Sequence, residues 1–248
     1  MPAEGLRTSK TSLPWFRGRD VLLRIIIVAN GNINPNDVPN PNGVANMDTP
    51  VSRFLHSGDL LIAADGGARH CQAFGVIPQV VIGDFDSLDR DSMTTLQDQG
   101  VKFVRYPVKK DYTDLELAIQ YAVSQGASEI VVLGALGNRW DQTLANLLLP
   151  VLAEFTGVKI TLIDGSQEIR LARSGQTLDL VGQPGDTVSL IPLGGDVNGI
   201  TTRGLEYPLL GEALRFGSTR GISNVLLEAK ATICVDEGVL LCVLIHQV

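Results

Sequence analysis

The stretch VVIGDFDSL, residues 80–88, shows the pattern on which the interpretation of the fold depends. A short run of β-branched residues, Val80–Ile82, leads directly into a glycine and two aspartates. A run that is apolar throughout is expected of a parallel strand that is covered on both faces. The polar residues that follow then mark the carboxyl end of that strand.

The same order of apolar run, turn residues and helical stretch recurs on both sides of this segment. The other runs that share it are Arg24–Val28, Leu60–Ala64, Lys102–Arg105, Glu129–Leu133 and Val158–Ile163. Strands that alternate with helices are typical of an α/β unit built on a parallel sheet. We therefore predict an N-terminal parallel-sheet α/β domain over residues 21–168.

Two of the intervening helices can be placed from their own patterns. In KDYTDLELAIQYAVSQG, residues 110–126, Thr113 and Glu116 have the spacing of a capping box, and Gly126 supplies a stop. In DQTLANLLLPVLAEF, residues 141–155, Pro150 should kink or split the helix. An apolar stripe runs along this second helix through Leu144, Leu147, Leu148, Val151, Leu152 and Phe155.

The helical period fades in the last third of the chain, where strand-like runs follow one another closely. These runs are Thr187–Ile191, Gly199–Thr202, Asn224–Glu228, Ala231–Val235 and Val239–Ile245. They predict a smaller, all-β, sandwich-like domain over residues 169–248. Residues 1–20 are polar and without period, so we expect a flexible N-terminal arm. The role of the long Asn30–Pro50 loop stays open.

Composition narrows the class of protein. A formal net charge of −7 argues against a nucleic-acid binder, which needs a basic face to neutralise phosphates. The apolar runs are too short to cross a bilayer, and the first residues lack the apolar stretch of a signal peptide. The three cysteines, Cys71, Cys234 and Cys242, have no metal-ligand spacing and fit reduced, buried thiols. We expect a soluble, cytoplasmic protein with no nucleic-acid or membrane partner.

Polar clusters stand at the carboxyl ends of four of the predicted strands. They are Asp65-Gly66-Gly67, Gly83–Ser87, Lys109–Asp114 and Gly134–Asp141. In open parallel α/β sheets, ligands bind beyond these strand ends. The coincidence of four such loops predicts a functional site at this edge of the sheet.

The two aspartates of residues 80–88 are the sharpest feature of that edge. Asp84 and Asp86, one residue apart on a turn, can converge on one hard cation such as Mg²⁺, which prefers oxygen ligands and bridges phosphates. Alternatively, the turn is solvated and Asp86 or Ser87 caps the next helix. Asp111 and Asp114 on the adjacent loop favour the metal, although an acid at position 114 also suits a first helical turn.

Two further loops have both a functional and a structural interpretation. Asp65-Gly66-Gly67 lets the backbone approach a ligand closely, but a tight turn between strand and helix explains it equally well. An arginine fork at position 139 suits phosphate oxygens, whereas Arg139 and Asp141 also fit a structural ion pair. Neither a G-x-G-x-x-G motif nor a P-loop is present, and no histidine is placed for a hydrolase triad.

These segments together resemble one family. ADGGARH, VIGDFDSL, KDYTDLELA and GNRWDQTLANLLL occur in the order and strand-end positions of thiamine pyrophosphokinases, and SLIPLGG, GITTRGLEYPL and GISN resemble that family's second domain. The similarity extends over nearly the whole chain from about residue 24. It implies that the α/β domain binds ATP and carries the catalytic residues, and that the β domain binds thiamine. It also implies a homodimer with its active sites near the subunit interface.

The resemblance assigns expected roles to individual residues. It implies that Mg²⁺ is held by Asp84, Asp86 and one or both of Asp111 and Asp114. ATP contacts are expected from Asp65, Gly66, Gly67, Lys110, Thr113, Gly137 and Arg139. Arg139 and Asp141 would position the nucleotide and the transferring group. Thiamine contacts are expected from Gln142, Tyr207, Ser223 and Asn224; Tyr207 stands where many relatives have tryptophan, and Gln142 where many bacterial relatives have histidine.

The implied reaction is an in-line attack of the thiamine hydroxyl on the β-phosphorus of ATP, which gives thiamine diphosphate and AMP. Asp111 and Asp141 both remain open as the acceptor of the hydroxyl proton. One alternative keeps the chemistry with a hydroxymethylpterin as acceptor. Others are a non-catalytic thiamine or nucleotide sensor and a sugar- or nucleotide-binding module of unrelated function.

Overall fold

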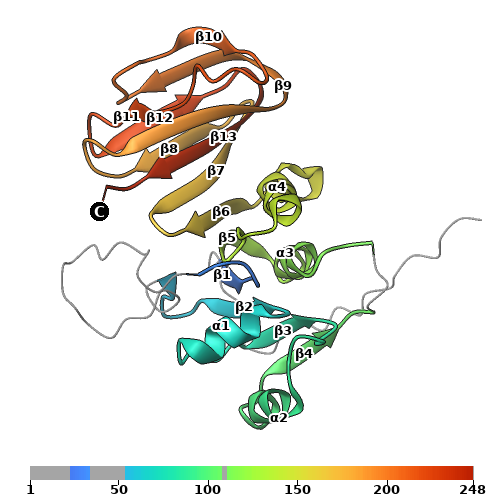
Figure 1. Cartoon of the computed structure of the whole chain (residues 1–248). Coiled ribbons are helices and arrows are strands. Elements are labelled where there is room, and N and C mark those ends of the chain that lie inside the picture. Colours follow the sequence, from blue (N-terminus) through green and yellow to red (C-terminus); the bar gives the residue numbers. More distant parts are fainter. Residues whose placement is uncertain (1–22, 34–53, 108–110, 248) are drawn as a thin grey trace, which may run out of the picture.

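A computed structural model describes residues 23–33, 54–107 and 111–247 of the chain (Figure 1). In chain order, its strands and helices are β1 (Leu23–Val28), β2 (Leu60–Ala64), α1 (Gly67–Ala73), β3 (Val80–Gly83), α2 (Arg90–Asp98), β4 (Lys102–Arg105), α3 (Asp114–Ser124), β5 (Ala127–Leu133), α4 (Trp140–Leu148), η3 (Leu149–Val151), η4 (Ala153–Phe155), β6 (Lys159–Asp164), β7 (Gln167–Arg173), β8 (Thr177–Val181), β9 (Thr187–Arg203), β10 (Leu210–Leu214), β11 (Asn224–Val225), β12 (Lys230–Cys234) and β13 (Glu237–Ile245).

The first six strands form a parallel arrangement in the order β4-β3-β2-β1-β5-β6. Their side chains alternate between two cores. Ile25 and Ile27 of β1 pack in the core that includes α3, whereas Ile26 and Val28 pack in the core that includes α1 and α2. Because both faces of the sheet are covered, strands such as β2 and β3 are apolar and buried throughout, as the sequence predicted, whereas the edge strand β4 exposes Lys102 and Arg105.

The sheet continues without a break into an antiparallel half. β6 turns back through Gly165 and Ser166 into β7, and Asp164 pairs with Gln167. From β7 the order runs to β13, β9, β12 and β8, while β10 and β11 also pair with β9. This half encloses a separate apolar core, with Leu180, Val188 and Leu240 fully buried. The mixed fold is therefore α/β followed by an antiparallel, strand-rich part, as expected from the sequence.

The antiparallel half differs in detail from the sequence prediction. Thr187–Ile191 and Gly199–Thr202 were expected to be separate strands, and this is wrong because both belong to the 17-residue strand β9. The glycines at 194 and 195 resemble turn signals, but here β9 passes from pairing with β13 to pairing with β10 and β12. Asn224–Glu228 contributes only Asn224–Val225 as strand, and β7, β8 and β10 were not predicted.

Both predicted helices are present, and the second, predicted over residues 141–155, is split near Pro150 into α4 and two 3-10 turns. Thr113 caps α3, where its hydroxyl oxygen accepts the N–H of Glu116 at 3.2 Å. α4 ends at Leu148, and Pro150 lies in the 3-10 turn that follows. None of the helices in the described residues is long and apolar enough to span a membrane.

The apolar stripe predicted over residues 141–155, which is divided among α4, η3 and η4, is only partly buried. Phe155 is 1% exposed, but Leu144 is 57% exposed and Leu148 is 50% exposed. Trp140, at the first position of the helix, is 77% exposed. The outer half of this stripe therefore does not contribute to the core of the chain.

Candidate active site

Four strand ends meet at one edge of the parallel sheet. The segment after β1 is joined to the segment after β5, because Gly31 donates its N–H to Gly134 O at 2.7 Å and Asn32 donates its N–H to Leu136 O at 2.7 Å. Asp65, just after β2, donates its N–H to Ile82 O of β3 at 2.7 Å. The segments after β2 and β3 therefore lie side by side, as do those after β1 and β5, whereas Lys109 and Lys110 of the loop after β4 lie outside the described residues.

The glycines of the Asp65-Gly66-Gly67 turn are required by chain packing. A Cβ atom at position 67 would clash with the carbonyl oxygen of Val28, and one at position 66 would clash with the side chain of Asn30. The structural interpretation of this turn therefore holds whether or not a ligand approaches it. The contact of Asn30 with this turn was not predicted, because Asn30 lies at the start of a long polar loop without a distinguishing pattern.

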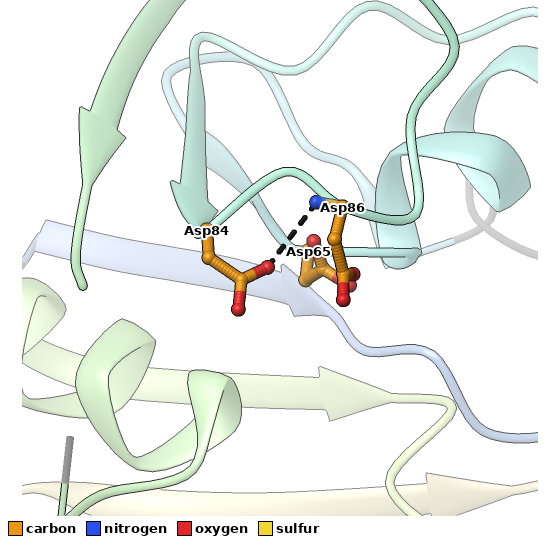
Figure 2. Close-up of side chains that lie close together, drawn as sticks. All are labelled: Asp65, Asp84 and Asp86. Carbon is orange, nitrogen blue, oxygen red and sulfur yellow. Dashed lines mark hydrogen bonds between the residues drawn. The ribbon is translucent and has the colours of Figure 1, made fainter. Parts of the chain in front are cut away.

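Three carboxylates converge at this edge. One ligand oxygen from each of Asp65, Asp84 and Asp86 lies within 4.8 Å of the others. Figure 2 shows the three side chains gathered at the turn after β3, with Asp65 reaching them from the end of β2. Asp65 is buried, Asp84 is half-buried and Asp86 is exposed, so the group extends from the protein interior to the solvent.

An unusual backbone brings Asp84 and Asp86 together. Phe85 between them has φ of 67°, a left-handed conformation that is rare for a bulky residue, and Asp65 has φ of 42°. The Phe85 ring is buried and meets the Phe103 ring edge-on at 5.1 Å. Arg105 lies over the Phe85 ring at 4.8 Å and donates to Asp84 O at 3.0 Å. These contacts hold the strained turn in place.

The three carboxylates fit a divalent cation. Within the described residues, Asp65 Oδ1 and Ser87 Oγ are buried and have no hydrogen-bond partner. A buried carboxylate oxygen without a partner is costly, and a hard cation with oxygen ligands would compensate it. The helix-capping alternative for Asp86 and Ser87 does not hold, because Asp89 caps α2 by accepting the N–H of Ser92 at 2.7 Å.

A fourth carboxylate, that of Asp114, lies next to these three aspartates. A Cβ atom on Gly83 would lie 3.2 Å from Asp114 Oδ1 and 3.0 Å from Asp65 Cβ. Asp114 begins α3, so its acid also suits the helix dipole. Asp111 is exposed, and neither it nor Asp114 belongs to the three-carboxylate group found among the described residues. Lys110 lies outside the described residues.

The loop after β5 contributes an ion pair at the start of α4. Arg139 Nε donates to Asp141 Oδ1 at 3.1 Å, and Nη2 donates to Oδ2. The hydrogen bond from Arg139 holds the pKa of Asp141 below its ordinary value, and Asp141 in turn raises the pKa of Arg139. Both side chains and Gln142 are exposed, so they are accessible to a ligand.

Backbone groups near this loop are already engaged within the chain. Thr143 Oγ1 donates to Gly137 O and accepts the N–H of Gly137, both at 3.1 Å. Asn146 donates to Ala135 O at 2.6 Å. Sequence reasoning missed Thr143 and Asn146 because both lie within a helical pattern, where a buried polar residue has no separate signal.

The residues expected to contact thiamine form a second group, in the antiparallel half. Asn224 Oδ1 accepts the N–H of Tyr207 at 3.0 Å, and Asn224 Nδ2 donates to Tyr207 O at 2.7 Å. Ser223 has φ of 60° and donates its N–H to Ser189 Oγ at 3.1 Å. The Tyr207 side chain is 64% exposed. This group lies beside β9 and β11, far along the sheet from β2 and β3 (Figure 1).

Comparison with known proteins identifies relatives over most of the chain. The family described as "Thiamin pyrophosphokinase, catalytic domain" matches residues 51–162, and "Thiamin pyrophosphokinase, vitamin B1 binding domain" matches residues 168–240. Thiamine pyrophosphokinase from Bacillus subtilis (strain 168) is 29% identical over 201 residues, which cover 81% of this chain and 94% of that protein. Thiamine pyrophosphokinase 1 from Arabidopsis thaliana is 31% identical over 172 residues, 66% of this chain and 64% of that protein. A crystal structure of the Bacillus subtilis enzyme has a TM-score of 0.77 at 29% identity and covers 91% of this chain and 100% of that chain.

Proposed function

Because this chain belongs to the thiamine pyrophosphokinase family and is an enzyme of that kind, we propose that it transfers the pyrophosphate group of ATP to the hydroxyl of thiamine. The products are then thiamine diphosphate and AMP. The hydroxyl oxygen forms a bond to the β-phosphorus, and the bond between that phosphorus and the oxygen of AMP breaks. The convergence of Asp65, Asp84 and Asp86 at the sheet edge is the observation that carries this proposal.

We propose that these three aspartates hold Mg²⁺, with Asp114 beside them. The buried, unpartnered Oδ1 of Asp65 supports this, because a bound cation would satisfy it. Bound there, the ion would neutralise charge on the phosphate oxygens of ATP. Asp65 was first expected to contact ATP alone, and its position next to Asp84 supports the added role. Metal binding by Asp111 stays a prediction.

The nucleotide is proposed to lie along the same edge. Arg139 and Asp141 are exposed at the start of α4 and can orient the transferring group. Gly66, Gly67, Thr113 and Gly137 border this edge, and we propose that they and Lys110 contact the phosphates of ATP. The lowered pKa of Asp141 makes it a weaker proton acceptor, which favours Asp111 as the acceptor of the hydroxyl proton.

Thiamine is proposed to bind against Tyr207 and Ser223. Gln142 is proposed to contact the side of the substrate that faces away from these two residues. The exposed ring of Tyr207 offers a face for stacking on the pyrimidine ring. The amide oxygen and the amide nitrogen of the Asn224 side chain each form a hydrogen bond with the backbone of Tyr207. We infer that Asn224 orients the tyrosine as well as contacting the substrate.

The distance between the two groups of residues supports a homodimer. β3 is the second strand of the sheet order and β9 is the ninth, so the two groups of residues stand at distant places in the sheet of one chain. We propose that a second copy supplies Tyr207 in trans, and that the exposed stripe of Trp140, Leu144 and Leu148 faces that copy.

Two remaining expectations are also proposals. We propose a catalytic unit over residues 21–168 and a thiamine-binding unit over residues 169–248, with the boundary inside β7. The arm expected over residues 1–20 and most of the Asn30–Pro50 loop lie outside the described residues. We further propose a cytoplasmic location, which the free thiols of Cys71, Cys234 and Cys242 support.

The reaction is tested by incubating the purified chain with ATP, Mg²⁺ and thiamine and resolving the products by chromatography. Thiamine diphosphate and AMP in equal amounts are expected. ADP with thiamine monophosphate would contradict attack on the β-phosphorus. A parallel incubation with a hydroxymethylpterin tests the acceptor, and faster turnover of the pterin would contradict thiamine as the substrate.

A further inference from the structure

A cavity opens where β6 and β7 separate. The two strands pair only from Leu162 with Ile169 to Asp164 with Gln167, whereas β7 stays paired with β13 as far as Arg173. The space between them has a volume of about 270 Å³. We call this space the fork cavity. It is lined by Pro150, Thr156–Ile160, Arg170–Arg173 and Gln176–Leu178.

The fork cavity is distinct from the candidate active site. Its β6 residues, Lys159 and Ile160, stand at the beginning of that strand. Since β6 runs parallel to β5, its beginning lies at the amino edge of the parallel strands. The aspartates follow the ends of β2 and β3 at the carboxyl edge. The two sites therefore lie on opposite edges of the sheet.

The fork cavity concentrates positive charge in an acidic protein. Its lining includes Lys159, Arg170 and Arg173 and no aspartate or glutamate, although the chain has a net charge of −7. Lys159 is neutralised by Glu129 at 3.1 Å. Arg170 and Arg173 have no carboxylate within 4.0 Å among the residues that the structure describes. Neither arginine therefore has a close ion-pair partner, although Arg170 interacts over a longer distance with the carboxylate of Asp179, whose pKa it helps to lower.

Most donors of these two arginines are not used by the described part of the chain. Arg170 Nη1 donates to Asp179 O at 2.7 Å, and Arg173 Nη2 donates to Pro150 O. A guanidinium carries five N–H donors, so each arginine retains donors for another acceptor. The two bonds also fix the position of each side chain before any ligand arrives, which lowers the entropy lost on binding.

The surroundings of Arg173 make an anion favourable there. The side chain is half-buried, and burial lowers its pKa because the charged form loses contact with water. An anion in the cavity would offset this loss. Phosphate oxygens match the fork of a guanidinium in two-point contact better than most other anions do.

We propose that the fork cavity binds the phosphate group of a small phosphorylated metabolite through Arg173 and Arg170, which reach it from the two faces of β7. The hydroxyls of Thr156 and Thr177 are in the lining and can add neutral donors. Ile160, Leu171 and Leu178 provide an apolar wall for a small organic part. A volume of about 270 Å³ is at the small end for ligand pockets, so a compact phosphate compound fits better than a nucleotide.

The test uses isothermal titration of the full chain with inorganic phosphate and with pyrophosphate, in EDTA so that no cation occupies the aspartates. Arg170→Gln is expected to weaken binding by about tenfold or more, because it removes charged hydrogen bonds. Arg215→Gln is the matched control, since it removes the same charge from an exposed position outside the cavity, and it should not change the affinity.

Arg173→Lys provides a second variant, because it keeps the charge while losing the two-point fork, and weaker binding by this variant supports the site. Thermal unfolding of each variant checks that it is folded. Equal affinity in wild type, Arg170→Gln and Arg173→Lys would overturn the proposal. An equal loss of affinity in Arg215→Gln would also overturn it, as would a wild type that is not saturated by roughly 10 mM ligand.

Discussion

Asp86 donates its backbone N–H to Oδ1 of Asp84 at 3.2 Å, across the left-handed residue Phe85. This short bond folds the turn back on itself, so that two carboxylates face the same space while the ring between them is buried. The site therefore depends on the backbone conformation of Phe85 as much as on the carboxylates of Asp84 and Asp86.

The first prediction concerns the carboxylates. Asp84→Asn and Asp86→Asn should each lower kcat/KM for thiamine diphosphate formation by about 100-fold or more, because cation binding loses a charged ligand. Thermal unfolding should change little, since neither side chain is part of the core. Product assays at several Mg²⁺ concentrations measure the effect, and partial recovery at high Mg²⁺ is expected. Asp98→Asn, an equal charge change at the exposed end of α2, should leave turnover unchanged.

A second prediction concerns Phe85. Phe85→Gly relieves the left-handed strain, worth about 1 kcal/mol, but it loses the buried ring, so the free energy of unfolding should fall by about 2–4 kcal/mol. Activity should also fall, because the turn no longer fixes Asp84 and Asp86. Denaturant unfolding and product assays measure the two effects. Loss of stability with unchanged kcat would show that the turn holds its shape without the ring.

Gly67→Ala tests the packing of the strand-to-helix turn. The added Cβ would meet the carbonyl oxygen of Val28, which belongs to the central strand and cannot move away. The free energy of unfolding should fall by about 3 kcal/mol or more. Gly195→Ala is the matched control, because nothing lies within 4 Å of a Cβ there. Similar unfolding midpoints for the two variants would contradict the predicted clash.

Mixing two inactive variants tests the proposed arrangement in trans. Asp84→Asn and the double variant Tyr207→Ala, Asn224→Ala damage different parts of the proposed site. If the parts come from different subunits, half of the randomly assorted dimers are mixed and each has one intact site, so co-expression should restore about a quarter of wild-type activity. Asp84→Asn with Asp86→Asn is the control and should restore none. Absence of recovery in the first pair, with mixed dimers present, would refute the arrangement.

The pH dependence of stability should report on Asp186. This carboxylate is 2% exposed, accepts the N–H groups of Gln247 at 2.9 Å and Gln183 at 2.8 Å, and lies 3.0 Å from His246 Nδ1. Burial raises its pKa, but these hydrogen bonds outweigh burial and lower it below the ordinary 3.8. A lowered pKa means that its stabilisation is complete above pH 3.8 and is lost as the pH falls through the folded-state value.

Asp186→Asn should therefore lower the free energy of unfolding at pH 7 by about 2 kcal/mol, since an amide cannot accept all of these hydrogen bonds as an ion. The gap between wild type and variant should narrow below pH 3.8. Urea unfolding between pH 7 and pH 3 measures this gap. A constant gap over that range would show that the charge of Asp186 contributes nothing.

The parallel half was predictable because its signals are local. β-branched runs such as Val80–Ile82 are buried on both faces, and Thr113 caps α3 in the way its spacing with Glu116 indicates. The antiparallel half was less predictable because its strands depend on distant partners. β7 contains Glu168, Arg170 and Arg173, and only its pairing with β6 and β13 makes it a strand.

The same limit applies to the candidate site. The pair Asp84 and Asp86 could be found from one short segment, whereas the proximity of Asp65 depends on β2 lying next to β3. The left-handed conformation of Phe85 has no sequence signal, since this region is usually occupied by glycine or asparagine. The position of Asp65 at the end of a predicted strand indicated that it lies at the carboxyl edge of the sheet. It did not indicate that Asp65 lies next to Asp84 and Asp86.

The place of β1 in the sheet sets the order in which a newly synthesised chain can fold. Among the described strands, β1 is the first to be synthesised, yet it lies between β2 and β5, and Val28 pairs with both Ala63 and Leu133. About 100 residues separate β1 from β5, so at ~5–20 residues per second the LRIIIV segment waits on the order of 5–20 s with one edge unpaired. An apolar, unpaired strand edge is a site of aggregation. Translation through β5 therefore sets the earliest moment at which the nascent chain can close its sheet, and chaperones that cover residues 23–28 until then should raise the yield of active enzyme.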